Sequence, residues 1–229
     1  MTANELREEL ETELAWRQEE LAFFKNQLNE IAENNKNKYR KGLILILYSH
    51  MEGYIKICLQ TYIHYINSQE LNRNDVSTGL MVASMHKEFI AYENLDRKYE
   101  IFRRELPEDA RLHRLYRRVD FMENIEEFKC QKLVIDDIIV DTESNLWYIV
   151  LQKNLYKLGL PVDLFSDYHN DIDALVKRRN SIAHGNFHAG VTKSEFTNWE
   201  TKVYGILSGV TMLIYDYANN KKYLNTANT

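Results

Sequence analysis

The sequence contains little of what a β-rich or disulfide-bonded protein needs. Only 2 prolines and 8 glycines occur in 229 residues, so the residues that close β-turns are scarce. The 2 cysteines, Cys58 and Cys130, match no metal-ligand spacing, and Cys58 lies in an apolar helical stretch where a buried thiol is expected. These scarcities favour a helical protein with two inert thiols.

Long apolar runs are also missing. The longest, from Leu43 to Tyr48, is far shorter than the ~20 residues of a membrane-spanning helix. The N-terminal segment is acidic and amphipathic, whereas a secretory signal begins with a basic end and an apolar run. We therefore expect a cytoplasmic protein with no membrane partner. Its formal net charge of −5 gives no general attraction for nucleic acid, so such binding would need a local basic patch.

Apolar periodicity predicts two long helices, over residues 4–33 and 38–66, with Asn4 as the cap of the first. The second is apolar almost all round, which is typical of a helix buried among several others. Its central stripe consists of Ile44, Leu47, Met51, Ile55, Cys58 and Tyr62. Polar residues embedded in such a helix need partners, and these are Ser49, His50 and Glu52.

Residues 70–141 differ in character and are predicted to be an insertion in a single domain that spans residues 1–229. We expect two or three helices up to about residue 130, and then a short strand pair or an extended connector over 131–141. Between Arg97 and Arg118, eight basic residues stand against four acidic ones. The insertion therefore carries a local basic patch in an acidic protein.

Three more helices are predicted beyond the insertion, over residues 144–159, 164–184 and 194–218. Gly159 and Pro161 separate the first two, and Ser194 is the expected cap of the last. The pattern as a whole predicts an all-α fold, an antiparallel helical bundle with a helical insertion.

The segment 171–185, DIDALVKRRNSIAHG, carries the most informative pattern. Its predicted inward stripe contains Ile172, Leu175, Val176, Ile182 and Ala183, and Arg179 falls on the same stripe. Burying an unpaired guanidinium is costly, so Arg179 needs a carboxylate or a polar cavity, and Glu52 in the buried helix is the candidate partner. His184 ends the helix just before Gly185, about 140° around the helix from Arg179.

The residues from Arg178 to Gly185, RRNSIAHG, resemble the motif of the HEPN superfamily, in which arginine and a polar residue precede a histidine. The run from Thr142 to Leu146 and the pair Gly159-Leu160 also resemble the SNL…GL segment of prokaryotic HEPN proteins of the ribonuclease-toxin kind. The helix around Glu52 is similar to the early HEPN helix that faces the motif. The resemblance covers residues 38–66 and 142–218, but not the insertion.

The resemblance implies a HEPN-like bundle that cleaves RNA without a metal or cofactor, through attack of the ribose 2′-hydroxyl on the adjacent phosphodiester. In this interpretation His184 transfers the proton and Arg179 stabilises the charge. Asn180 orients a phosphate oxygen, and Glu52 orients Arg179 or His184. Residues predicted to bind substrate are Arg178, Ser49, Arg114, Arg117 and Arg118, with Tyr99, Phe102 and Tyr116 available to stack on unpaired bases.

HEPN proteins generally dimerise with two motifs facing one cleft, so the resemblance implies a homodimer with a composite active site. It also implies a toxin or antiviral-defence effector, with an antitoxin or another regulatory protein as a partner. Three alternatives stay open at this stage. The chain could be a catalytically inactive HEPN module that binds nucleotide or protein, the motif match could be accidental, and the basic segment could be a solvated face laced with salt bridges.

Overall fold

The computed structural model describes residues 1–104, 106, 108 and 111–225. Within them the regular elements are helical, and strand-type pairing is limited to two isolated bridges, Asn72 with Lys132 and Val76 with Leu224. The predicted all-α fold is confirmed. The α-helices are α1 (Ala3–Asn26), α2 (Glu33–Ser68), α3 (Thr78–Ser84), α4 (His86–Glu93), α5 (Arg111–Glu123), α6 (Ile125–Cys130), α7 (Tyr148–Lys157), α8 (His169–Ala183) and α9 (Lys193–Asn219).

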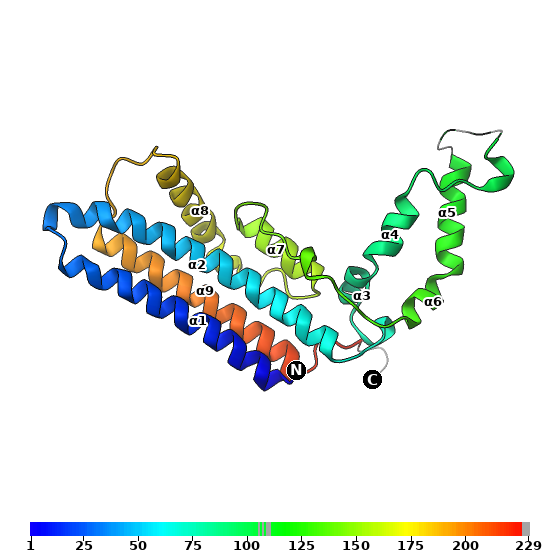
Figure 1. Ribbon diagram of the computed structural model, residues 1–229, viewed down its shortest axis with the longest axis horizontal. Coiled ribbons are helices and arrows are strands. Elements are labelled where there is room, and N and C mark those ends of the chain that lie inside the picture. The colour runs from blue at the N-terminus through cyan, green and yellow to red at the C-terminus, as the bar shows by residue number, and fades with distance from the viewer. Residues whose placement is uncertain (105, 107, 109–110, 226–229) are drawn as a thin grey trace.

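The bundle is built from the three longest helices, with two shorter ones packed on one side. α1, α2 and α9 lie side by side, α8 packs on α2, and α7 packs against α8 and α3 (Figure 1). α1 and α8 run in the opposite direction to α2 and α9, so neighbouring segments of the chain form antiparallel pairs. The arm, which we define as residues 78–130 with α3 to α6, projects away from the far end of α2 (Figure 1).

α2 is the central helix of the core. All six residues of its predicted stripe are buried. α2 is also long and apolar enough to cross a membrane by length and composition, but 56% of its most apolar stretch is buried inside the protein. That degree of burial is typical of the core helix of a soluble protein.

The helices predicted outside residues 70–141 exist, but several of their ends were placed wrongly, and the described residues between 70 and 130 form four α-helices, α3 to α6, instead of the two or three predicted. α1 ends at Asn26 and α2 already begins at Glu33, because the polar residues left between the two predicted helices form the mostly exposed first turn of α2. Thr2 caps α1 instead of Asn4, and Thr192 caps α9 instead of Ser194. Each threonine stands three residues before a glutamate and forms a capping box, a more specific signal than nearness to the apolar stripe.

The arm is joined to the bundle through a buried arginine. Arg73 lies just before α3 and donates hydrogen bonds to Glu88 Oε1 in α4 (2.9 Å) and to the carbonyls of Ser84 (2.9 Å) and Phe128 (3.1 Å). It thereby ties α3, α4 and α6 together at the base of the arm. Residues 131–141 form an extended connector with a short 3₁₀ turn at Asp137–Ile139, which was one of the two predicted forms.

The buried hydroxyls of α2 allow a matched test of the core. The Tyr54 hydroxyl bonds with Thr211 Oγ1 (2.6 Å) and the Leu10 carbonyl (3.2 Å), whereas the equally buried Tyr62 hydroxyl bonds with no described residue. Tyr54→Phe should therefore lower the free energy of unfolding by about 1 kcal/mol, and Tyr62→Phe should leave it unchanged or raise it. Urea unfolding of the full chain measures both, and equal shifts for the two variants would contradict this account.

Candidate active site around Arg179 and His184

α8 presents the motif at the edge of the bundle. Ile172, Leu175 and Val176 are buried against the core, as predicted, but Ile182 is half-buried and Ala183 is exposed. The inward stripe therefore ends earlier than the periodicity indicated. Arg179 comes one turn after the last buried residue, and its side chain keeps 26% of its surface exposed. The guanidinium thus lies at the boundary between core and solvent.

The Arg179 guanidinium is held by residues from three separate segments. It stacks on the Tyr48 ring of α2, 4.5 Å from the ring centroid. Its Nη1 donates to Asn180 Oδ1 at 2.7 Å and to Asn145 Oδ1 at 3.2 Å. Nη2 lies 3.7 Å from Glu52 Oε2, which is an ion pair without a short hydrogen bond. Tyr48 and Asn145 were not among the predicted site residues.

Tyr48 joins α2 to the loop before α7. Its hydroxyl accepts a hydrogen bond from the Leu146 backbone N–H (2.9 Å), and its burial raises the pKa of the phenol to about 12. Tyr48 therefore stays neutral at physiological pH and offers an aromatic face to the cation. The same hydrogen bond fixes the backbone next to Asn145. Tyr48 therefore contacts Arg179 with its own ring and also helps to position the Asn145 amide that accepts from Arg179.

The loop that carries Asn145 has an unusual backbone. Glu143 and Ser144 both have positive φ, 50° and 67°, a conformation that residues other than glycine seldom adopt. Asn145 follows directly, and its N–H closes a turn onto the Thr142 carbonyl (3.0 Å). The chain thus uses a strained turn to bring an amide oxygen to Arg179, a pattern that is enriched at functional sites. The SNL resemblance marked this loop, but it did not identify the asparagine as a contact of Arg179.

His184 lies at the other end of the motif. Its backbone N–H donates to the Asn180 carbonyl (2.9 Å), and Gly185, with φ of 73°, ends the helix. The imidazole is exposed and bonds with no described side chain. Arg179 therefore packs onto α2 while His184 faces solvent, as expected for two residues about 140° apart on one helix.

Two further cations, Arg178 of α8 and Lys41 of α2, meet at the Phe187 ring. Arg178 stacks on the Phe187 ring at 4.2 Å and lies 3.8 Å from Glu195. Lys41 of α2 donates to the Phe187 carbonyl, and its ammonium lies 5.6 Å from the same ring. Phe187 thus brings Arg178 and Lys41 to one short loop just beyond His184. The sequence analysis missed Lys41, because its role depends on a contact 146 residues away in the chain.

Four predicted substrate-binding residues lie outside this cluster. Ser49 faces α1 and lines a groove of about 400 Å³ with Trp16 and His50. Arg114, Arg117 and Arg118 belong to α5, in the arm, away from α8 (Figure 1). Arg117 is also buried and donates to the Arg97 carbonyl (3.3 Å), so it does not present its charge at the surface as substrate binding requires.

The aromatic residues predicted to stack on bases instead stack on one another. Tyr99 lies 4.8 Å from Tyr116 and 5.6 Å from Phe102, measured between ring centroids. These contacts hold the segment before α5 against that helix. Their rings therefore contribute to the packing of the arm.

The Arg179–Glu52 pair can be tested for a purely structural role. At 3.7 Å and with both side chains partly exposed, its coupling free energy should be below about 1 kcal/mol. A double-mutant cycle with Arg179→Met and Glu52→Gln, followed by urea unfolding, measures this coupling. A value near 3 kcal/mol or more would instead identify a buried structural pair and would argue that Arg179 serves packing alone.

The comparisons with known proteins agree with the motif. Residues 6–223 match the model of the MAE_28990-like HEPN family, so the match includes both the bundle and the arm. No curated protein and no solved structure gives a significant match. Because the family match covers nearly the whole chain, an accidental occurrence of the motif RRNSIAHG is not supported. The protein belongs to the MAE_28990-like HEPN family.

Proposed function

We propose that the protein is a metal-independent endoribonuclease with Arg179 and His184 at its active site. The observation that carries the proposal is the state of Arg179, which is oriented by Tyr48, Asn145 and Asn180 but remains partly open to solvent. A guanidinium kept for packing would be expected to use its donors inside the protein. Here Nη1 is bonded, whereas Nε donates to no described residue and Nη2 only faces Glu52 from 3.7 Å.

The chemistry needs two groups. The ribose 2′-oxygen forms a bond to phosphorus and loses its proton, the bond from phosphorus to the 5′-oxygen breaks, and the leaving oxygen gains a proton. The products are a 2′,3′-cyclic phosphate and a 5′-hydroxyl. His184 would transfer the proton, an effect worth about 10²–10⁴-fold. Arg179 would stabilise the negative charge on the phosphorane, an effect worth about 10²–10³-fold by comparison with other oxyanion donors.

The remaining cluster fits this scheme in supporting roles. Asn180 and Asn145 fix the guanidinium plane through their amide oxygens, and Glu52 balances its charge. Arg178 and Lys41, both on Phe187, would bind the phosphates that flank the scissile bond. RNA is therefore the proposed substrate, and the biological role is that of a toxin or antiviral-defence effector in the cytoplasm, restrained by an antitoxin or another regulatory protein.

A homodimer would resolve the separation between the two catalytic side chains. Within one helix, Arg179 packs on α2 while His184 is exposed at the helix end. If two copies face one another across a two-fold axis, the histidine of one protomer can approach the arginine of its partner. We propose such a composite site.

Cleavage of end-labelled RNA in EDTA tests the reaction. Wild type should give cyclic-phosphate ends, and Arg179→Ala or His184→Ala should each reduce the rate by about 100-fold or more. Asn145→Ala should cause a smaller loss, because Nη1 keeps its bond to Asn180. His188→Ala is the matched control, since His188 is exposed four residues beyond His184 and lies outside the proposed site.

Each variant is checked for native helicity and for dimerisation. If folded wild type cleaves no RNA in a broad panel, the endoribonuclease proposal fails, and the alternative of a catalytically inactive HEPN module that binds nucleotide or protein is favoured. If His188→Ala lowers the cleavage rate as much as His184→Ala does, the assignment of proton transfer to His184 is wrong.

Mixing two inactive variants tests the composite site. When Arg179→Ala and His184→Ala protomers are allowed to exchange, half of the dimers are mixed, and each mixed dimer has one intact pair of residues if the pair comes from two protomers. Activity should then recover to about a quarter of wild type. If the arginine and histidine act within one chain, the mixture should stay as inactive as its components.

A further inference from the structure

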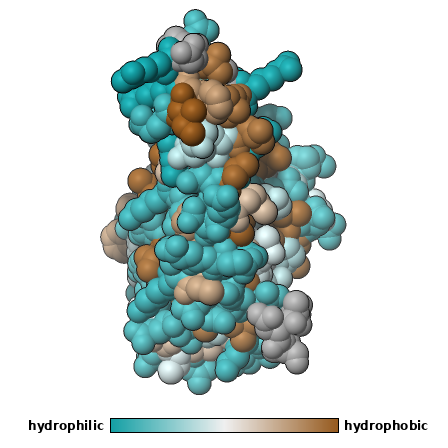
Figure 2. Space-filling model, turned by 90° about the vertical axis from the view of Figure 1, so that its right-hand side faces the viewer, coloured by the Kyte–Doolittle hydropathy of each residue, from teal (hydrophilic) through white to brown (hydrophobic). Residues whose placement is uncertain are grey.

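The arm exposes far more apolar surface than its size predicts. Seventeen large apolar side chains are exposed among the described residues, and eight of them lie in the arm, less than a quarter of the chain. These eight are Val82, Ile90, Leu95, Ile101, Leu106, Leu115, Val119 and Met122. Figure 2 shows apolar side chains gathered on the upper part of the face that the arm occupies. Concentrated exposure of this kind usually marks an interaction surface.

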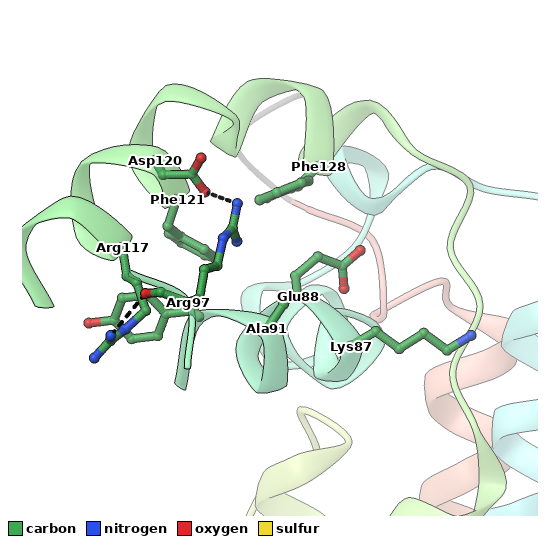
Figure 3. Close-up of a pocket in the computed structure, with 9 residues that line it drawn as sticks. Lys87, Glu88, Ala91, Arg97, Arg117, Asp120, Phe121 and Phe128 are labelled. Carbon is green, nitrogen blue, oxygen red and sulfur yellow. Dashed lines mark hydrogen bonds and ion pairs between the residues drawn. The ribbon is translucent and has the colours of Figure 1, made fainter. Parts of the chain in front are cut away.

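Helix α5 contributes most clearly to this surface, because it carries apolar side chains on its outward side as well as Phe121, which stacks inward on Phe89. Its inward side carries the buried His113 and Arg117, together with Asp120, which pairs with Arg97 at 2.8 Å (Figure 3). Its outward side carries Leu115, Val119 and Met122, which are 55%, 45% and 65% exposed. In a helix that packs only within its own chain, the apolar stripe would face inward. The outward stripe of α5 therefore lacks a partner within the described chain.

We propose that α5 packs against α5 of a second copy of this chain, with the two helices parallel across a two-fold axis. Leu112, Leu115, Val119 and Met122 follow one another at spacings of three, four and three residues, the seam of a helix pair. In heptad terms a leucine and a β-branched valine occupy the a positions, and leucine and methionine the d positions. Leucine at d and a β-branched residue at a are favoured in parallel two-stranded pairs.

The charges at the edges of the stripe select this arrangement. Arg111 and Arg118 lie along one edge, and Tyr116 and Glu123 lie along the other. A parallel two-fold pair brings opposite edges together, so Arg118 meets Glu123 of the second copy and Arg111 meets its Tyr116. An antiparallel pair would bring each edge against itself and place arginine beside arginine. The helix is thus complementary to itself in the parallel orientation only.

This contact is separate from the proposed active site. α5 and α8 lie at opposite ends of the molecule (Figure 1), and the argument uses no residue of the motif. At thirteen residues α5 is shorter than two heptads, so the pair is a contact between two arms and not an extended coiled coil. The proposal therefore stands or falls independently of the ribonuclease activity.

Disulfide formation at the two-fold axis gives a direct readout. The full chain with Cys130→Ser, which removes the exposed native thiol, is combined with Leu115→Cys. In a parallel pair residue 115 faces its own copy, so mild oxidation should give a covalent dimer in high yield. Ile149→Cys in the same background is the control, because Ile149 is similarly exposed, at 68%, but lies on α7 of the bundle. It should give little dimer.

Charge exchange on the Leu115→Cys background tests the orientation. Arg118→Glu or Glu123→Arg alone should lower the yield of the covalent dimer roughly tenfold. Each substitution makes residue 118 of one copy and residue 123 of the other carry the same charge, and the two-fold axis repeats this repulsion. The two together should restore it. Arg118 and Glu123 lie on opposite edges of α5, about 140° apart, so the rescue cannot arise within one chain. Circular dichroism confirms that each variant is folded.

Two results would overturn the proposal. The first is a Leu115→Cys yield no higher than that of Ile149→Cys. The second is that the charge variants leave the yield unchanged, while Arg118→Glu weakens the binding of a labelled RNA, measured by fluorescence anisotropy. In that case α5 is an RNA-binding surface, in line with the predicted substrate contacts of Arg114 and Arg118.

Discussion

The enclosure of α2 by α1, α8 and α9 is the constraint on which the rest of the structure depends. A helix enclosed on several sides cannot direct its polar groups freely to water, so a buried polar group costs free energy unless it has a specific partner, and the Tyr62 hydroxyl is an exception that has none among the described residues. Tyr48 and Glu52, one turn apart on the side of α8, meet this requirement through the Leu146 backbone and Arg179. The burial that stabilises the bundle therefore also fixes the position of the candidate catalytic arginine.

The contacts of Arg179 lower the cost of partly burying its charge and also orient the guanidinium for the proposed function. A guanidinium at the end of the inward stripe of α8 would be unfavourable if it were fully buried and poorly oriented if it were fully exposed. Its stacking on a neutral tyrosine and its bonds to two amide oxygens fix its plane without neutralising its charge. Among the described residues, Glu52 is the carboxylate partner of Arg179, and it stays 3.7 Å away. The net positive charge that phosphate binding needs is thereby retained.

Sequence patterns predicted the features that depend on residues close together in the chain. They did not predict the contacts between segments that are distant in the chain. The buried stripe of α2 and the position of Arg179 on α8 followed from periodicity, and the pairing of Glu52 with a cation followed from the cost of burying charge. The contacts of Asn145 and Lys41 did not, because they depend on a strained turn and on a loop that folds back over α2. The caps were recognisable in principle, since Thr2 and Thr192 each begin a capping box.

In the basic segment of the arm, the number of arginines alone did not predict which of them are available at the surface. Its arginines suggested a surface for RNA, yet Arg117 is inside the arm, Arg97 pairs with Asp120, and Arg118 donates to the Tyr92 hydroxyl at 3.1 Å. Arginine can act in this way because its planar fork reaches several partners and stacks on aromatic rings. The inside of the arm combines these polar contacts with an aromatic cluster of Phe89, Phe121 and Phe128, and a separate set of apolar side chains stays exposed on the outside. An arm built in this manner is expected to be completed by a partner.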